Sequence, residues 1–178
     1  MNKIRLALAV ATLPLAVLAT ACTTTTAATD DNPTRRELRE LVDRNQITAL
    51  VDQLGSALDA GRFDDFRAIY TAEATAETPG GEVEGRDALI AQASRNHSDN
   101  LRIQHIISNV KIDMKGDTAD VRANVIATFA PAATVAKTAP EPQYTLGGVY
   151  RFDAVRTGEG WRLARVENTP TWSTGTRP

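Results

Sequence analysis

His105 is the residue of this chain best suited to acid–base chemistry. It lies in the segment LRIQHIISN (residues 101–109), where Leu101, Ile103 and Ile107 alternate with polar positions and share its side. Burial in an apolar cavity lowers the pKa of an imidazole, which then serves as a general acid or base near neutral pH. The open alternative is a core histidine that is hydrogen-bonded to a neighbouring strand or helix.

The sequence offers no second reactive centre of a familiar kind. Its two histidines, His97 and His105, are 8 positions apart (105 − 97), and its single cysteine, Cys22, precedes the domain, so no metal site is expected. No glycine-rich phosphate loop precedes a helix, because Gly147 and Gly148 begin a strand and are better suited to a bend. No cofactor is therefore expected.

Five further side chains could line a pocket through hydroxyl, amide or ring contacts. They are Tyr70, Asn124, Thr128, Tyr150 and Trp172. Packing or a place on the surface is the open alternative for each of them, since no spacing separates the two cases. We carry all five as candidate ligand-binding residues.

The charge balance argues against a nucleic-acid partner. The 178 residues contain 20 Lys plus Arg and 22 Asp plus Glu, which gives a net charge of -2. No run of basic residues stands out, and four Phe, three Tyr and two Trp are few for base stacking. The length suits one domain with a proper core.

The first 21 residues resemble a secretory signal. MNKIR is basic, LALAVATLPLAVL is an apolar run too short to span a bilayer, and small residues follow it. Cys22 directly after Ala19-Thr20-Ala21 resembles a bacterial lipobox, which makes it a lipidated first residue; ordinary cleavage to a secreted protein is the alternative. We expect an exported chain anchored to the membrane through Cys22, with residues 22–33 as a flexible tether.

A long helix is predicted from Thr34, where TRRE forms a capping box with Glu37, to Gly61. It carries two apolar stripes on different faces, the first formed by Leu38, Leu41 and Val42 and the second by Ile47, Leu50, Val51, Leu54 and Leu58. Either the helix kinks near residues 44–45, or its first turns pack on something different. Shorter helices are expected over residues 63–70 and 87–95.

The second half of the chain is predicted to form strands. Residues 101–114 alternate in polarity, and the apolar parity switches after Asn109, which predicts a bulge. Further strands are expected over residues 120–129, 144–155 and 161–168, with a mobile Ala/Pro loop at 130–143. The prediction is an α+β fold, in which three N-terminal helices pack on a strongly curved antiparallel (mixed at most) sheet. The sheet forms a cone with one pocket, the domain covers residues 34–170, and 171–178 is a tail.

The order of these segments resembles the SnoaL-like, nuclear transport factor 2-like superfamily. The resemblance rests on ITALVDQLGSALDAGRFDDFRAIYTAEA, PGGEVEGRDALIAQ, QHIISNVKIDMKGDTADV and GGVYRFDAVRTGEGWRLARV, which cover most of residues 45–168. It implies a cone of three helices on a bent sheet. It does not imply one function, because the superfamily includes dehydratases, isomerases, cyclases and plain binding modules.

Two enzyme templates of the superfamily are only partly matched. Thr78 and Leu54 stand where steroid isomerases have their base and a tyrosine, which argues against that chemistry. His105 matches a histidine of scytalone dehydratases, but no second histidine occurs near Phe129. An acid at the position of Asp59 often faces the cavity mouth in this superfamily, where it could pair with His105 and orient the ring. A solvated residue near the helix end is the alternative.

Three hypotheses of function follow from these observations. The first is an exported SnoaL-like domain that binds a small, mostly apolar molecule without strong catalysis, because the expected pocket has few acids and bases. The second is a dehydratase or isomerase that uses His105, assisted by Asp59, as general acid or base. The third is a homodimeric protein-interaction module that pairs through the outer face of its sheet.

Overall fold

The computed structural model describes residues 32–132 and 140–178 of the chain. The helical elements are α1 (Pro33–Ala60), the short 3-10 helix η1 (Phe63–Asp65), α2 (Phe66–Ile69) and α3 (Arg86–Asn96). The strands are β1 (Tyr70–Thr78), β2 (Gly81–Glu84), β3 (Leu101–Lys115), β4 (Thr118–Pro131), β5 (Tyr144–Thr157) and β6 (Gly160–Gly175). They form one six-stranded sheet in the order β2-β1-β6-β5-β4-β3.

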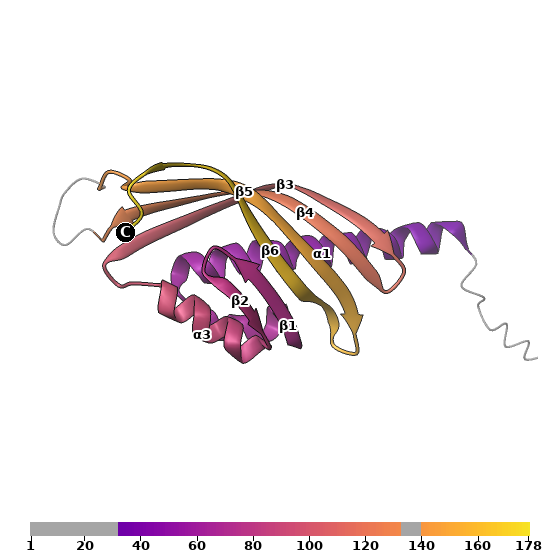
Figure 1. The fold of residues 1–178 in the computed structure, drawn as a ribbon. Helices are drawn as coiled ribbons and strands as arrows, with labels where there is room; N and C mark the ends of the chain where they lie inside the picture. Colours follow the sequence, from indigo (N-terminus) through magenta and orange to yellow (C-terminus); the bar gives the residue numbers. More distant parts are fainter. Residues whose placement is uncertain (1–31, 133–139) are drawn as a thin grey trace, which may run out of the picture.

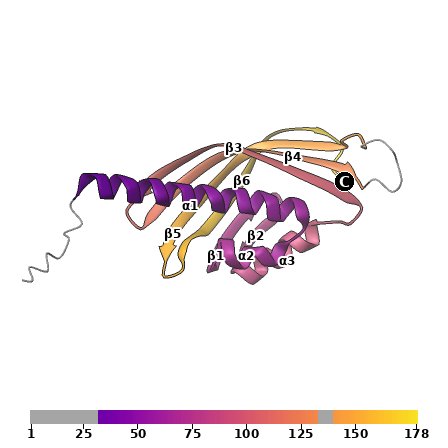
Figure 2. The same ribbon diagram turned by 180° about the vertical axis from the view of Figure 1, so that it is seen from behind.

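The sheet bends strongly, and the helices cover its inner face (Figures 1 and 2). All strand pairs are antiparallel except β1 and β6, which run parallel. The predicted α+β cone with a mixed, curved sheet is therefore confirmed. Strand β6 continues to Gly175, so residues 171–175 belong to the sheet and the predicted tail is shorter than expected.

The hairpin β1–β2 was absent from the prediction. Its first strand, YTAEATAET, is rich in Ala and Glu, which have low strand propensity, and no regular alternation marks its buried side. Tyr70, Ala74 and Ala76 nonetheless face the core. The turn at residues 79–80 closes the hairpin, and β1 then completes the sheet by pairing with β6.

Helix α1 is one continuous helix whose N-terminal turns extend beyond the sheet (Figures 1 and 2). Asn32 caps it by accepting a hydrogen bond from the Thr34 backbone N–H at 3.0 Å, so the predicted cap at Thr34 is wrong by two residues. Gly61 ends the helix with a positive φ of 66°, as expected. Ile47, Leu50, Val51 and Leu54 enter the core, whereas Leu38, Leu41 and Val42 remain 60%, 65% and 46% exposed.

The bulge predicted after Asn109 is confirmed. Asn109 adopts a positive φ of 55°, and the pairing of β3 with β4 shifts between Ser108 and Lys111. Before the bulge His105 and Ile107 face inward, and after it Ile112 faces inward. The bulge therefore lets one long strand line the cavity with its first half and cover α1 with its second.

A buried polar cluster joins α1 to the β5–β6 hairpin. The Trp161 indole N–H donates to Asp43 Oδ1 at 3.0 Å, and Arg156 Nη2 donates to Asp43 Oδ2 at 2.5 Å. The Arg156 guanidinium lies 4.7 Å from the centre of the Trp161 ring and also binds Asp117. Both Asp43 oxygens are therefore used, which satisfies a carboxylate that is only 6% exposed.

Several predictions concern residues outside the described ranges. The signal at 1–21, the lipidated Cys22, nearly all of the tether at 22–33, and the part of the Ala/Pro loop between 133 and 139 all lie there. They remain predictions. None of the helices in residues 32–132 and 140–178 combines the length and apolar character needed to cross a bilayer.

Candidate functional site

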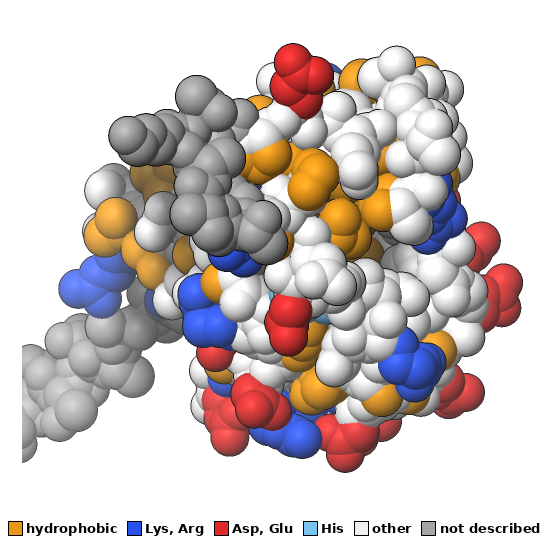
Figure 3. Space-filling model, turned by 90° about the vertical axis from the view of Figure 1, so that its left-hand side faces the viewer, with side chains coloured by type: hydrophobic (Ala, Val, Ile, Leu, Met, Phe, Trp, Pro, Cys, Tyr) orange, Lys and Arg blue, Asp and Glu red, His pale blue; other side chains and the backbone are white. Residues whose placement is uncertain are grey.

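The cone encloses a cavity of about 430 Å³ between α1, α3 and the inner face of the sheet. Its wall is largely apolar, with Leu54, Leu58, Phe66, Leu89, Ile103 and Val166 among the lining side chains. In Figure 3, which looks onto one end of the cone, hydrophobic side chains gather around the centre of the face. A cavity of this size and character is typical of a small-molecule site.

His105 and Asp59 meet at the wall of this cavity. The Asp59 Oδ1 atom lies 2.7 Å from His105 Nδ1 and also accepts the backbone N–H of His105 at 2.8 Å. The imidazole lines the cavity with its side chain 11% exposed, and the carboxylate stands behind it at 31%. The two residues are 46 positions apart and meet because the last turns of α1 cross β3.

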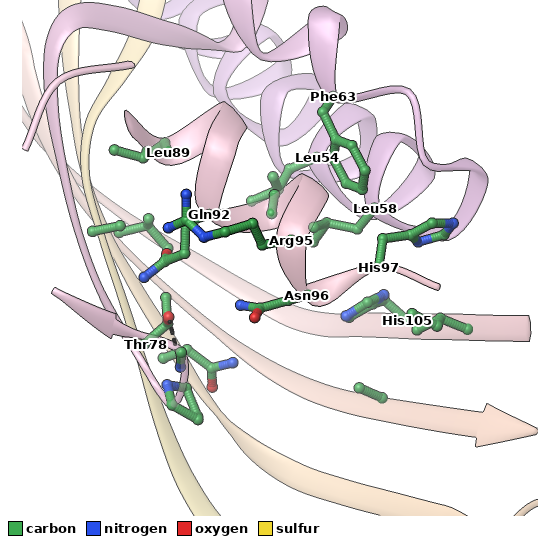
Figure 4. Close-up of a pocket in the computed structure, with 18 of the residues that line it drawn as sticks. Leu54, Leu58, Phe63, Thr78, Leu89, Gln92, Arg95, Asn96, His97 and His105 are labelled. Carbon is green, nitrogen blue, oxygen red and sulfur yellow. Dashed lines mark hydrogen bonds between the residues drawn. The ribbon is translucent and has the colours of Figure 1, made fainter. Parts of the chain in front are cut away.

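This contact fixes the tautomer of His105. An ionised carboxylate only accepts hydrogen bonds, so the neutral imidazole carries its proton on Nδ1 and donates it to Asp59. The Nε2 atom then keeps its lone pair. Because one carboxylate oxygen holds both the ring and the backbone of His105, the ring is held firmly, which is what a proton acceptor at a reacting carbon requires. Figure 4 shows His105 among the side chains around the cavity.

Tyr70 and Tyr150 line the cavity as predicted. Burial, followed by the negative charge of Asp59, raises the pKa of Tyr150 from 10.0 to about 12. Burial also raises the pKa of Tyr70 well above its ordinary value. Both side chains are therefore neutral phenols at physiological pH, which can donate a hydrogen bond to an oxygen or halogen of a ligand.

One inward-facing row of the sheet lies between His105 and Tyr150. His105 shares its row across the sheet with Ala127 and Leu146, and Tyr150 shares its row with Ala123. The row between them contains Ile107, Val125 and Gly148, and a Cβ added at Gly148 would lie 2.8 Å from the Thr169 carbonyl oxygen. The backbone of β6 therefore approaches Gly148 closely, and both polar groups line the same cavity.

Two buried polar atoms at the cavity wall have no hydrogen-bond partner in the described part of the chain. They are Oδ1 of Asn168 and Nδ1 of His97. Asn168 is opposite Tyr150 across β5 and β6, and His97 packs edge-on against Phe63. Sequence reasoning missed both residues. Asn168 lies two positions after the apolar Val166 in the same strand, and this shared face was the signal that could have found it. His97 lies in a loop, where no pattern predicts the direction of a side chain.

Three of the predicted ligand-binding residues do not line the cavity. Asn124 and Thr128 are opposite Ser108 and Gln104 on the outer face, because the alternation of β4 directs Ala123, Val125 and Ala127 inward. Trp172 is 49% exposed and stacks over Gly147, because the pairing of β5 and β6 shifts between Gly147 and Gly148. These three assignments are corrected to the outer sheet face.

Thr78 occupies the position at which steroid isomerases have their base, and its hydroxyl is part of a turn. Thr78 lines the cavity, but its hydroxyl accepts the Gly80 backbone N–H at 3.2 Å and so stabilises the β1–β2 turn. Leu54, at the tyrosine position of that template, contributes only apolar surface. In residues 32–132 and 140–178, no three His, Cys, Asp or Glu side chains cluster as metal ligands.

Comparisons with known proteins agree with this geometry. The SnoaL-like domain family matches residues 39–167. An uncharacterised protein of Mycobacterium tuberculosis, Rv2910c, is 32% identical over 134 residues, which cover 73% of this chain and 86% of that protein.

Solved structures share the fold. The Kfla4162 protein of Kribbella flavida has a TM-score of 0.67 at 24% identity and covers 76% of this chain and 95% of its own. A hexachlorocyclohexane dehydrochlorinase, LinA type 2, has a TM-score of 0.66 at 14% identity, with 80% and 97% covered.

Proposed function

The chain belongs to the SnoaL-like domain family, and we propose that it is an enzyme that abstracts a proton from its substrate and eliminates a leaving group. It acts on a small, mostly apolar molecule inside the cone. The observation that carries this proposal is the contact of 2.7 Å between His105 Nδ1 and Asp59 at the wall of an apolar cavity. The expectation of binding without strong catalysis rested on a pocket without an acid–base pair, and this contact removes that reason.

The proposed reaction is a 1,2-elimination. His105 Nε2 takes a proton from a carbon of the bound molecule, and the electrons of that C–H bond form a C=C bond. The leaving group on the adjacent carbon departs with its bonding electrons. The positive charge that forms on the imidazole is stabilised by Asp59, which already accepts the Nδ1 proton.

Tyr150 is the proposed acid. Its phenol is neutral below a pKa of about 12 and lines the same cavity as His105. It donates a hydrogen bond to the departing oxygen or halogen. A departing hydroxyl takes the phenol proton and leaves as water, and the proton that His105 took from carbon then restores the phenol. The dehydrochlorinase among the structural neighbours is named for an elimination, but its 14% identity carries only the fold.

Substitution of Tyr150 by Phe tests the reaction. A panel of apolar alcohols and halides with an acidic C–H next to the leaving group is followed by the absorbance of the new double bond. We expect the Tyr150→Phe variant to convert the best substrate roughly 10²-fold more slowly in kcat, because one hydrogen-bond donor to developing charge is lost. The matched control is Tyr144→Phe, since Tyr144 does not line the cavity. No turnover by wild-type protein on any member, or an unchanged rate in Tyr150→Phe, argues against this role.

A homodimer is a second proposal, supported by an exposed apolar row on the outer sheet face. Ile106, Ile126 and Trp172 are 54%, 38% and 49% exposed, and the pairing of β3 to β6 places them in one row through Gly147. A self-complementary patch of this kind suits an isologous dimer. We expect residues 32–178 to sediment as a dimer and Ile126→Asp to be a monomer. A wild-type monomer at high micromolar concentration would exclude the pairing.

A further inference from the structure

The charged side chains at the cavity are all of one sign. Arg95 and Arg177 line it, and no Asp or Glu side chain does so within residues 32–132 and 140–178. The carboxylate of Asp59, which does not line the cavity, is already bound to the His105 ring. Cationic side chains at a cavity wall favour an anionic ligand group over a cationic one.

Arg95 is positioned to meet such a group. It belongs to the last turn of α3, and Figure 4 shows it among the cavity-lining side chains, beside Gln92 and Asn96 on the same helix. Gln92 is buried and donates its amide N–H to the Gly81 carbonyl, so α3 is fixed against the β1–β2 hairpin. Arg177 reaches the cavity from the segment that follows β6.

Within residues 32–132 and 140–178, neither guanidinium is neutralised by an ion pair. In the described part of the chain, no carboxylate forms an ion pair with Arg95 or Arg177, whereas Arg67, Arg151 and Arg165 each have an acidic partner. Both arginines are exposed. They can therefore bind an anion while it keeps part of its hydration, which avoids the large cost of burying a charge.

We propose that the natural substrate is an apolar carboxylic acid whose carboxylate is bound by Arg95 and Arg177 while its hydrocarbon body fills the cavity beside His105. This inference rests on the proposed elimination and names its substrate class. The planar guanidinium matches a carboxylate in two parallel hydrogen bonds, which gives orientation as well as affinity. The reacting C–H then lies away from the carboxylate, in the apolar part of the molecule, where the imidazole can reach it.

Paired ligands test the carboxylate directly. Binding of 2-naphthoate and 2-naphthamide, and of cyclohexanecarboxylate and its amide, is measured by calorimetry on the full domain, residues 32–178. We expect each acid to bind wild-type protein about 10-fold more tightly than its amide, because charge-assisted hydrogen bonds are worth more than neutral ones, less the screening at an exposed site. In Arg95→Gln with Arg177→Gln, this ratio falls to about 1 while the amides keep their affinity.

The control is Arg102→Gln, since Arg102 is exposed on β3 and does not line the cavity. It should keep the wild-type ratio. A wild-type ratio near 1, or a ratio that survives the double substitution, overturns the proposal. Binding and conversion together separate failure of the proposed elimination from failure of the carboxylate proposal. Tight, arginine-dependent binding of acids without conversion of any acid refutes the elimination alone, whereas conversion of neutral substrates only refutes the carboxylate alone.

Discussion

Replacing His105 by asparagine is expected to slow turnover of the best substrate roughly 10²–10⁴-fold, because the proton acceptor is lost. Asparagine is similar in size and can still accept or donate a hydrogen bond at the Nδ1 position, so the wall of the cavity is kept. The substrate should still bind with similar affinity, so that the loss appears in kcat rather than in KM. Steady-state kinetics on the same panel of substrates measures both.

Asp59→Asn is the companion variant. The asparagine can still accept the His105 backbone N–H, but it no longer stabilises the imidazolium that forms during the reaction, so a loss of roughly 10²-fold is expected. If the two residues act as a unit, the double variant is no slower than His105→Asn alone. Multiplicative losses in the double variant would instead show that Asp59 acts independently of the ring.

The matched control for these variants is Asp52→Asn. Asp52 is exposed on the same helix and does not line the cavity. Its rate should equal that of the wild type. An unchanged rate in His105→Asn, with intact folding, would remove the imidazole from the reaction.

Loss of the Asp43 carboxylate is expected to cause the largest loss of stability. In Asp43→Ala the indole N–H of Trp161, a residue that is only 2% exposed, loses its acceptor, and Asp117 is the acidic partner that Arg156 keeps among the described residues. Breaking a buried pair by removing one partner costs several kcal/mol, and the partial exposure of Arg156 reduces this to about 2–4 kcal/mol in the free energy of unfolding. Urea denaturation measures the loss.

Asp52→Ala is the control, since an exposed substitution on the same helix should change the free energy of unfolding by less than about 0.5 kcal/mol. Equal stability of Asp43→Ala and the wild type would contradict the role of this cluster.

The same carboxylate predicts a dependence of stability on pH. The hydrogen bond from Arg156, opposed by burial and assisted by Trp161, holds the pKa of Asp43 below its ordinary 3.8. A group whose folded pKa is depressed stabilises the fold above its unfolded pKa and loses this contribution as the pH falls through the folded value. The wild type should therefore lose this stability below about pH 4, and Asp43→Asn should lack this part of the acid dependence.

The strands of the second half were predictable because their inward side chains are apolar and alternate regularly. The parity switch at Asn109 even located the bulge of β3. The same rule explains an error, since Asn124 and Thr128 have the outward parity and should not have been placed in the cavity. Trp172 could not be placed this way, because the shift of pairing at Gly147–Gly148 reverses the parity of β6 beyond it.

The candidate site was only partly predictable. His105 was found because it shares an apolar strand face, but its contact with Asp59 depends on how far α1 extends over β3. Nothing local to either residue determines that distance. Arg95 and Asn168 were missed because a charged residue on a helix and an amide in a strand look like surface residues until the fold places them around the cavity.

The most direct test needs no substrate. Nitrogen NMR of the ¹⁵N-labelled His105 side chain, assigned with the His105→Asn variant, reports which ring nitrogen carries the proton. The contact between His105 and Asp59 requires the neutral ring to carry its proton on Nδ1 and none on Nε2, and this preference should weaken in Asp59→Asn. A proton on Nε2 of the neutral ring would leave no lone pair toward the cavity, and would contradict the proposed enzyme at its central step.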